Sequence, residues 1–384
     1  MTDLETRALL PEGLHDDLPP DAEFEAELVA RLIGVFAGHG YDRVKPPLIE
    51  FEESLLGGPG AAQAPTMFRL MDPVSQRMLA VRSDMTIQVA RIATTRLAHV
   101  ARPLRLCYAG QVLRVKGSQL RAERQFGQAG IELIGGAPEA ADVEVLLLAA
   151  EAMALLGIAS PALDLTLPTL VPTIAQGLGL DEAATRTARE ALDGKDEARL
   201  ESLAPAPRAL FAALLEAAGP AEEAMPEILA LDLPPAARAL AEGLAARIAH
   251  VRAAMPDIQL TVDPGEYRAH EYHTGFGFTA FARGVRGELG RGGRYLVEAP
   301  GGGQTEEATG FTLYVDSLLR ALPHPAPAPT LFVPAGTPTE TARRLRAEGW
   351  RTRAGLVPVT DAAAEARRID CTHWLDGSTP RALT

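Results

Sequence analysis

The segment from Arg114 to Glu132 carries polar side chains at a spacing that suits the binding of a small amino acid. In a β-strand, residues two positions apart share a face. The residues expected to point the same way are Phe126, Gln128, Gly130 and Glu132. An amide and a carboxylate on one face, beside a glycine that leaves room, suit a buried polar ligand. A carboxylate can hold an ammonium group, and an arginine suits a carboxylate.

The segment Arg82 to Thr86 has two interpretations. It follows an expected strand and opens an expected helix, so Ser83 or Asp84 would accept hydrogen bonds from the free backbone N–H groups of the first turn. The same side chains would also suit a ligand held by the strand that ends at Glu132. Together with the stretch from Arg268 to Tyr295, these segments predict a pocket for a small amino acid.

Other motifs do not indicate further chemistry. The glycine-rich stretch Gly284 to Gly303 lacks the lysine of a phosphate-binding loop and the strand-to-helix glycine pattern, so we expect a turn between two strands. The histidines His270 and His273 are not spaced four apart on a helix, as a metalloprotease zinc site requires. Cys107 lies in an apolar run, which predicts a buried, inert thiol. No nucleophile motif is present, and we expect neither a metal nor a cofactor.

Composition places the chain among ordinary globular proteins. Of its 384 residues, 47% are hydrophobic and 23% charged, and the formal net charge of −13 argues against a large basic face that follows nucleic-acid phosphates. No apolar run approaches the roughly 20 residues that cross a bilayer. The first ten residues also lack the layout of a signal peptide. We therefore expect a cytoplasmic protein with no membrane contact.

Hydrophobic periodicity predicts an α+β core over residues 1 to 322. Expected helices cover 23–36, 86–99, 139–156 and 311–322, and expected strands cover 44–49, 66–70, 77–81, 104–115, 124–134, 258–262, 272–283 and 294–297. Hairpins separated by helices indicate an antiparallel sheet flanked by helices.

Two segments differ in character from this core. From about residue 172 to residue 255, alanine, leucine and glutamate at helical spacing predict a helical insertion. Residues 323–329 form a proline-rich linker. Beyond it, residues 330–384 begin with a strand-helix-strand pattern (331–334, 337–348 and 350–355) and predict a small α/β unit.

Five motifs in one order resemble histidyl-tRNA synthetases over about residues 8 to 320. Gly40-Tyr41, Pro47 and Glu50 resemble the first motif of class II aminoacyl-tRNA synthetases, and Arg82 to Thr86 resembles the Arg-Pro-Glu-Gly-Thr segment of histidyl-tRNA synthetases. The remaining matches are Arg114 to Glu132 with the second motif, Arg268 to Tyr272 with the Arg-Gly-Leu-Asp-Tyr histidine motif, and Gly292 to Tyr295 with Gly-Gly-Arg-Tyr. The family also has a helical insertion at this place.

The resemblance implies histidine as the ligand and assigns residues to it. Asp84, Thr86 and Gln128 would face the α-ammonium group, and Arg114 or Arg268 would face the carboxylate. The residues implied to surround the imidazole are Glu132, Tyr272 and Tyr295. His273 replaces a second tyrosine of the family.

The departures from the family fall on its ATP site. Lys116 stands where the synthetases have a glutamate that helps to hold adenine, and Gly117 replaces a basic residue. In the third motif, Tyr314 stands in place of a glycine and Ser317 in place of the arginine that neutralises ATP phosphate. Loss of one such preplaced charge costs about 3 kcal/mol of transition-state stabilisation. We therefore expect no activation of the amino acid.

This combination resembles the family of ATP phosphoribosyltransferase regulatory subunits of bacterial histidine biosynthesis. The resemblance implies a homodimer built through the first motif and assembly with the short catalytic subunit into a hetero-octamer, with roles in activation and in feedback inhibition by histidine. The C-terminal unit resembles a truncated anticodon-binding domain, so we expect no tRNA partner. The feedback histidine has two possible places, this pocket and the interface between subunits. The alternatives are a divergent histidyl-tRNA synthetase and a free-standing amino-acid sensor.

Overall fold

The computed structural model describes residues 9–57, 63–117, 121–267, 273–298, 305–324, 326 and 328–383. The chain divides into two compact units, Met1–Pro323 and His324–Thr384. Among the described residues, no helix has the length and apolar character that a membrane crossing requires.

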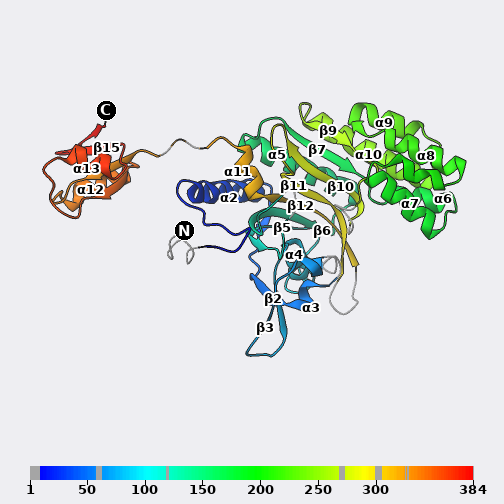
Figure 1. Cartoon of the computed structure of the whole chain (residues 1–384), viewed down its shortest axis with the longest axis horizontal. Coiled ribbons are helices and arrows are strands. Elements are labelled where there is room, and N and C mark those ends of the chain that lie inside the picture. The colour runs from blue at the N-terminus through cyan, green and yellow to red at the C-terminus, as the bar shows by residue number, and fades with distance from the viewer. Residues whose placement is uncertain are drawn as a thin grey trace. The chain divides into compact units, whose positions relative to one another are not determined.

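A nine-stranded sheet forms the centre of the first unit (Figure 1). Its strands, in spatial order, are β1 (Asp42–Arg43), β5 (Leu104–Leu113), β6 (Gln125–Ile134), β12 (Thr305–Tyr314), β11 (Gly290–Glu298), β10 (His273–Ala282), β7 (Pro161–Thr166), β9 (Gln259–Val262) and β8 (Gly219–Pro220). Only the β1–β5 and β7–β9 pairs are parallel. The predicted antiparallel sheet flanked by helices is confirmed.

The helices α2 (Asp21–Gly38) and α5 (Pro138–Leu156) pack on one face of this sheet. In α2 the buried residues recur four positions apart, at Leu28, Leu32 and Phe36, so one stripe of the helix enters the core. The opposite face carries α4 (Thr86–Thr94), whose Val89 and Ala93 pack against strands β5 and β6. The predicted helix 86–99 is therefore five residues too long.

The predicted helical insertion is confirmed and lies beyond the β7 and β9 edge of the sheet (Figure 1). Its elements are α6 (Leu170–Gly177), α7 (Glu182–Asp193), the 3-10 helix η2 (Glu197–Ser202), α8 (Pro205–Glu216), α9 (Ala221–Ala230) and α10 (Pro235–Ala254). Proline occupies the first turn of α8 and of α10, where its missing N–H leaves no hydrogen bond unmade. Helix α10 packs on α5, so the insertion is joined to the core by side-chain packing as well as by the chain.

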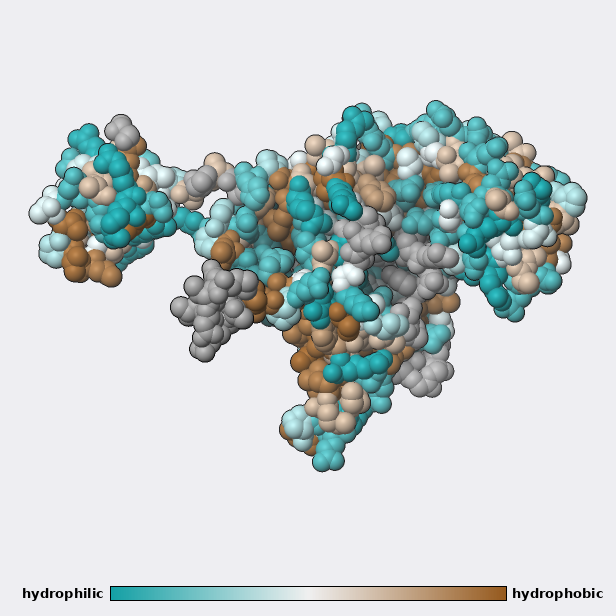
Figure 2. Space-filling view, viewed as in Figure 1, coloured by the Kyte–Doolittle hydropathy of each residue, from teal (hydrophilic) through white to brown (hydrophobic). Residues whose placement is uncertain are grey.

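A small sheet, β2 (Ile49–Phe51), β4 (Met78–Val81) and β3 (Arg69–Met71), projects from the core with the helix α3 (Glu52–Leu55). Figure 2 shows brown, hydrophobic atoms on this projecting part of the molecule. The exposed apolar residues here are Ile49, Leu70, Met71 and Met78, with Leu48 directly before β2. The predicted strand 66–70 is wrong in its first half, because only Arg69–Met71 pairs with β4.

The predicted helix 311–322 is wrong over its first four residues. Strand β12 runs to Tyr314, and the helix α11 covers only Val315–Ala321. The side chains of this segment alternate between the two faces of the sheet, as in a strand. Phe311 and Leu313 enter the core under α2 and α5, whereas Thr312 and Tyr314 face the other side. The expected turn in the glycine-rich stretch 284–303 precedes β11, which begins at Gly290, four residues before the predicted strand 294–297.

The second unit contains its own four-stranded sheet. Its elements are β13 (Thr330–Val333), α12 (Thr339–Ala347), β14 (Arg351–Ala354), α13 (Ala362–Arg368), β15 (His373–Asp376) and β16 (Thr379–Ala382). The predicted strand-helix-strand pattern is confirmed, and β13 pairs in parallel with β14 and β15. Leu331, Val333, Leu345 and Leu375 form one of its buried clusters.

Candidate functional site

Glu132 lies on the central strand β6, on the sheet face that α4 covers, and is only 1% exposed. Tyr108 of β5 donates its hydroxyl to Oε1 at 3.1 Å, and Tyr295 of β11 donates to Oε2 at 2.7 Å. Gly310 stands opposite Glu132 in β12, where a Cβ atom would lie 2.1 Å from the carboxylate. The carboxyl group is thus held between strands in space that only glycine leaves open.

Burial raises the pKa of Glu132 to about 8, although the hydrogen bond from Tyr295 favours the carboxylate form. The nearby charge of Asp84 acts in the same direction as burial. A cationic group placed beside Glu132 would lower this pKa and form a charge-assisted hydrogen bond. The site is therefore suited to a ligand that carries a positive charge or can accept a proton.

The gap expected at Gly130 is filled by a protein side chain. A Cβ atom at Gly130 would lie 2.6 Å from the hydroxyl of Tyr108. That hydroxyl also lies 2.7 Å from Thr312 Oγ1 and 3.2 Å from Thr86 Oγ1. Gly130 thus makes room for Tyr108 rather than for a ligand, which corrects the interpretation drawn from alternation. Tyr108 is a site residue that was missed, although it stands on the same face as Tyr295, with the strands β6 and β12 between them.

Asp84 and Gln128 are joined at the start of α4. Asp84 Oδ1 accepts a hydrogen bond from the backbone N–H of Thr86 at 2.8 Å, and Gln128 donates to Asp84 Oδ2 at 3.0 Å. Gln128 Oε1 in turn accepts from the backbone N–H of Met85 at 3.2 Å. The capping interpretation of Asp84 is confirmed, and the same bonds hold Gln128 in place.

A narrow cavity of about 10 Å³ lies beside Glu132. Its lining residues are Thr86, Glu132, His273, Arg291, Gly292, Gly293, Tyr295, Gly310, Phe311 and Thr312. This volume holds about one water molecule. A bound amino acid therefore needs more room than this cavity offers.

Strand β11 contributes Arg291, Gly292 and Gly293 to this cavity besides Tyr295, and of these Arg291 lies outside the matched motif. Gly293 and Arg291 share the face of Tyr295 because they are two and four positions before it, respectively. A Cβ atom at Gly293 would lie 2.4 Å from the His273 ring, so glycine is required there. Arg291 pairs with Glu288. Alternation along Gly290 to Tyr295 would have identified Arg291 if the predicted strand had begun at Gly290 rather than at Arg294.

The structure places the other expected ligand residues apart from this cavity or does not describe them. Arg114 lies at the end of β5, with its guanidinium 5.0 Å from the ring of Phe126 and its Nε 3.4 Å from the carbonyl of Ser83. Arg268 and Tyr272 fall outside the described residues. The structure thus brings Thr86, Glu132 and Tyr295 into the cavity lining.

The side chain of Arg121 fills the region of the expected ATP-site departures. Its guanidinium lies 3.8 Å from the centre of the Tyr314 ring and 4.4 Å from that of Phe126. It donates to Ser317 Oγ at 3.0 Å and is 8% exposed. Lys116 is exposed to solvent. A Cβ atom at Gly117 would lie 2.4 Å from the carbonyl oxygen of Ala122, so no larger residue fits there. Arg121 thus places a buried cation, held between two aromatic rings, beside Ser317.

Replacing Arg121 with alanine is expected to lower the free energy of unfolding by about 1–3 kcal/mol, because the buried cation–π contacts and the bond to Ser317 disappear. Urea unfolding measures this loss. Arg320→Ala is the matched control, because Arg320 also donates to Ser317 Oγ but its side chain is 41% exposed. We expect less than about 1 kcal/mol for that exposed arginine. Equal losses in both variants would contradict a special role for the buried position.

Cys107 confirms the expected inert thiol. It is buried beneath α2, and burial raises its pKa to about 11, so the reactive thiolate form is scarce at neutral pH.

Comparison with known proteins places this geometry among synthetase-like proteins. A family model for histidyl-tRNA synthetase matches residues 13–318. A protein of Rhodospirillum centenum described as an ATP phosphoribosyltransferase regulatory subunit is 56% identical over 371 residues, covering 96% of this chain and 95% of its own. A protein of Paramagnetospirillum magneticum with the same description is also 56% identical, and 98% of each chain is covered.

Solved structures agree on the fold. A Bacillus halodurans structure described as an ATP phosphoribosyltransferase regulatory subunit/histidyl-tRNA synthetase matches with a TM-score of 0.82 at 24% identity, over 94% of this chain and 96% of its own. Histidyl-tRNA synthetase from Nostoc matches with a TM-score of 0.79 at 18% identity, over 96% of this chain and 91% of its own.

Proposed function

Because the chain belongs to the family of ATP phosphoribosyltransferase regulatory subunits, we propose that it binds histidine at Glu132 and uses this binding to regulate the catalytic subunit. Its role is regulatory and lies in histidine biosynthesis, and the catalytic subunit of the phosphoribosyltransferase is its partner. It does not activate the amino acid itself.

The proposal rests on one contrast. Around Glu132 the side chains form a cavity, whereas in the neighbouring region the side chain of Arg121 fills the space. The pocket keeps a buried carboxyl group with two tyrosine donors. In the neighbouring region the guanidinium of Arg121 is enclosed by Tyr314, Phe126 and Ser317, so this cation is directed to protein side chains. Positive charge must be preplaced to stabilise a phosphoryl transition state. The arrangement supports binding without activation.

The proposed contacts follow the family pattern. The imidazole of histidine lies against Glu132 and Tyr295, with Tyr272 nearby, and the α-ammonium group faces Asp84, Thr86 and Gln128. The carboxylate faces Arg114 or Arg268. Arg291 adds a further cation at the wall of the same cavity. The raised pKa of Glu132 supports the imidazole assignment, since an imidazole titrates near neutral pH.

The proposed assembly is a self-dimer that joins the short catalytic subunit in a hetero-octamer in the cytoplasm, without tRNA. The exposed apolar residues of the small sheet support a protein interface, because they lie next to Pro47 and Glu50 of the first motif. One groove lies along β2 and is lined by Pro46, Pro47 and Ile49, and another lies along α2.

A mixing experiment tests the function. The purified chain is expected to show no histidine-dependent ATP–pyrophosphate exchange, and addition of the short catalytic subunit is expected to produce phosphoribosyl transfer that histidine inhibits. Catalytic subunit alone and a mixture with boiled regulatory chain serve as controls. Absence of stimulation in the native mixture would contradict the proposal, and charging of tRNA by the chain alone would indicate a synthetase instead.

A further inference from the structure

The strand β11 carries the pocket on one face and a buried ion network on the other. Tyr295 and Gly293 line the cavity, while Arg294 points to the opposite side of the sheet, toward α5. Adjacent residues of a strand must diverge in this way. Any movement of β11 that admits a ligand therefore also moves Arg294.

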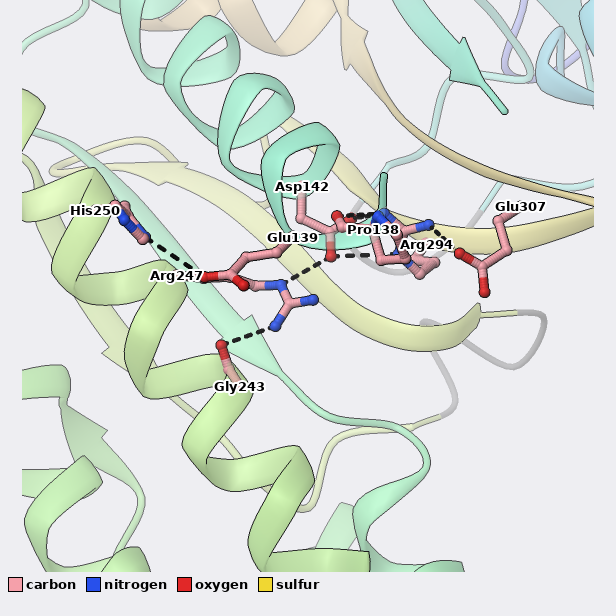
Figure 3. Close-up of polar contacts among 8 residues, drawn as sticks. All are labelled: Pro138, Glu139, Asp142, Gly243, Arg247, His250, Arg294 and Glu307. Carbon is pink, nitrogen blue, oxygen red and sulfur yellow. Dashed lines mark hydrogen bonds and ion pairs between the residues drawn. The ribbon is translucent and has the colours of Figure 1, made fainter. Parts of the chain in front are cut away.

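Arg294 is tied to the first turn of α5 (Figure 3). Its Nη2 donates to Asp142 Oδ1 at 2.5 Å and to the carbonyl of Pro138 at 2.6 Å. Its Nη1 donates to Glu307 Oε2 on the neighbouring strand β12 at 3.0 Å. The side chain of Arg294 is 7% exposed and that of Asp142 is fully buried.

Asp142 also holds the helical insertion. Arg247 of α10 donates from Nε to Asp142 Oδ2 at 2.8 Å and from Nη1 to the carbonyl of Gly243 at 2.8 Å. Figure 3 shows the two arginines approaching the same carboxylate from different elements, Arg247 from α10 and Arg294 from β11. One buried carboxylate thus joins the pocket strand to the insertion, across 105 residues of sequence.

A second contact reaches the other pocket strand. The guanidinium of Arg247 lies 6.0 Å from the ring of Phe276 on β10, the strand that begins with His273. Arg247 is 16% exposed, so it is packed against the core rather than extended into solvent. The only other ion pair between α10 and α5 among the described residues joins His250 and Glu139, whose side chains are more than half exposed.

We propose that the Arg294–Asp142–Arg247 network transmits the ligand state of the pocket to the helical insertion, with Arg247 as the positioning residue on the insertion. The proposal rests on histidine binding at Glu132. Charges buried in this way tolerate little change in geometry, because a lost partner leaves an uncompensated charge. A ligand that fixes β10 and β11 therefore fixes Arg294 and Asp142, and it makes the detachment of α10 less favourable.

Hydrogen–deuterium exchange of the full chain, with and without histidine, tests this coupling. In the wild type, histidine is expected to slow amide exchange in α10 by about fivefold or more, the lower range of measured couplings between sites. In Arg247→Met, which keeps an unbranched apolar stem but not the charged guanidinium, we expect that histidine still binds by calorimetry and that the slowing in α10 is lost. Arg247→Lys, which keeps a charge within reach of Asp142, recovers part of it.

His250→Ala is the matched control, because it removes the exposed contact of the same helix to α5 and is expected to preserve the wild-type response. Protection of α6 and α9 without ligand verifies that the insertion remains folded in each variant. Histidine binding without any change in α10 of the wild type would overturn the coupling and leave the proposed function intact, as would an undiminished response in Arg247→Met. If histidine does not bind the wild type, the assignment of the pocket fails, and the coupling fails with it.

Discussion

Replacing Glu132 with glutamine is expected to weaken histidine binding by about tenfold to a hundredfold, which corresponds to a charge-assisted hydrogen bond of about 1.5–3 kcal/mol. Glutamine has nearly the same shape but cannot become an anion opposite the imidazole. Isothermal titration calorimetry at neutral pH measures the change. Glu144→Gln is the matched control, because Glu144 pairs with Arg105 and Tyr41 away from the cavity. Unchanged affinity in Glu132→Gln would place the ligand elsewhere, for example at the interface with the catalytic subunit.

The same substitution has an expected signature in the pH dependence of stability. The pKa of Glu132 is raised to about 8 in the folded protein by burial, above the ordinary value of 4.5 that applies after unfolding. The folded state therefore holds the proton more tightly, and this contribution to stability is present below pH 4.5 and is lost as the pH rises toward 8. It is on the order of a few kcal/mol. Glu132→Gln should lack this loss, so urea unfolding at pH 5 and pH 9 should show a smaller decrease than in the wild type.

Asp142→Ala is expected to lower the free energy of unfolding by about 3–5 kcal/mol, because it leaves the buried Arg294 with only the half-exposed Glu307 as a carboxylate partner. Arg247 loses the same partner. Urea unfolding followed by far-ultraviolet circular dichroism, rather than by tryptophan fluorescence, measures this loss of stability in the first unit. Glu139→Ala is the matched control, since Glu139 lies in the same turn of α5 but forms only the exposed pair with His250.

Two outcomes for Asp142 would be informative about its role in stability. A loss below about 1 kcal/mol would mean that water or other side chains replace the carboxylate, contrary to its complete burial. A double variant Asp142→Ala with Arg294→Met should recover part of the loss, because both charges then leave the interior together. Failure of this recovery would attribute the effect to packing around Arg294 rather than to charge.

Much of the fold follows from local patterns in the chain. The stripe of Leu28, Leu32 and Phe36 is sufficient to predict α2, and the long apolar periodicity before Gly157 predicts α5. Strand β12 was not predicted, because Phe311 to Tyr314 adjoin a true helix and are apolar at a spacing that suits either state. Only pairing with β6 on one side and β11 on the other selects the strand.

The candidate site could be predicted only where residue type and spacing along one segment determine it. Motif spacing identified Glu132 and Tyr295, and alternation placed Gln128 and Glu132 on one face. Alternation cannot report what fills a gap, so Gly130 was interpreted as space for a ligand when Tyr108 of the neighbouring strand occupies it. Arg121 was missed because its partners come from two separate segments of the chain, Phe126 from β6 and Tyr314 and Ser317 from the junction of β12 and α11.

By itself, the sequence determined the class of fold and the family, since these depend on residue type and spacing along one segment, and it predicts the positions at which the ATP site departs from the synthetases. Only the tertiary structure shows that the side chain of Arg121 lies between the rings of Phe126 and Tyr314 and contacts Ser317. It also decided that one carboxylate, Asp142, joins the pocket strand to the insertion. Contacts between distant segments depend on strand register and helix packing, and these arise only when the whole chain buries its apolar surface together.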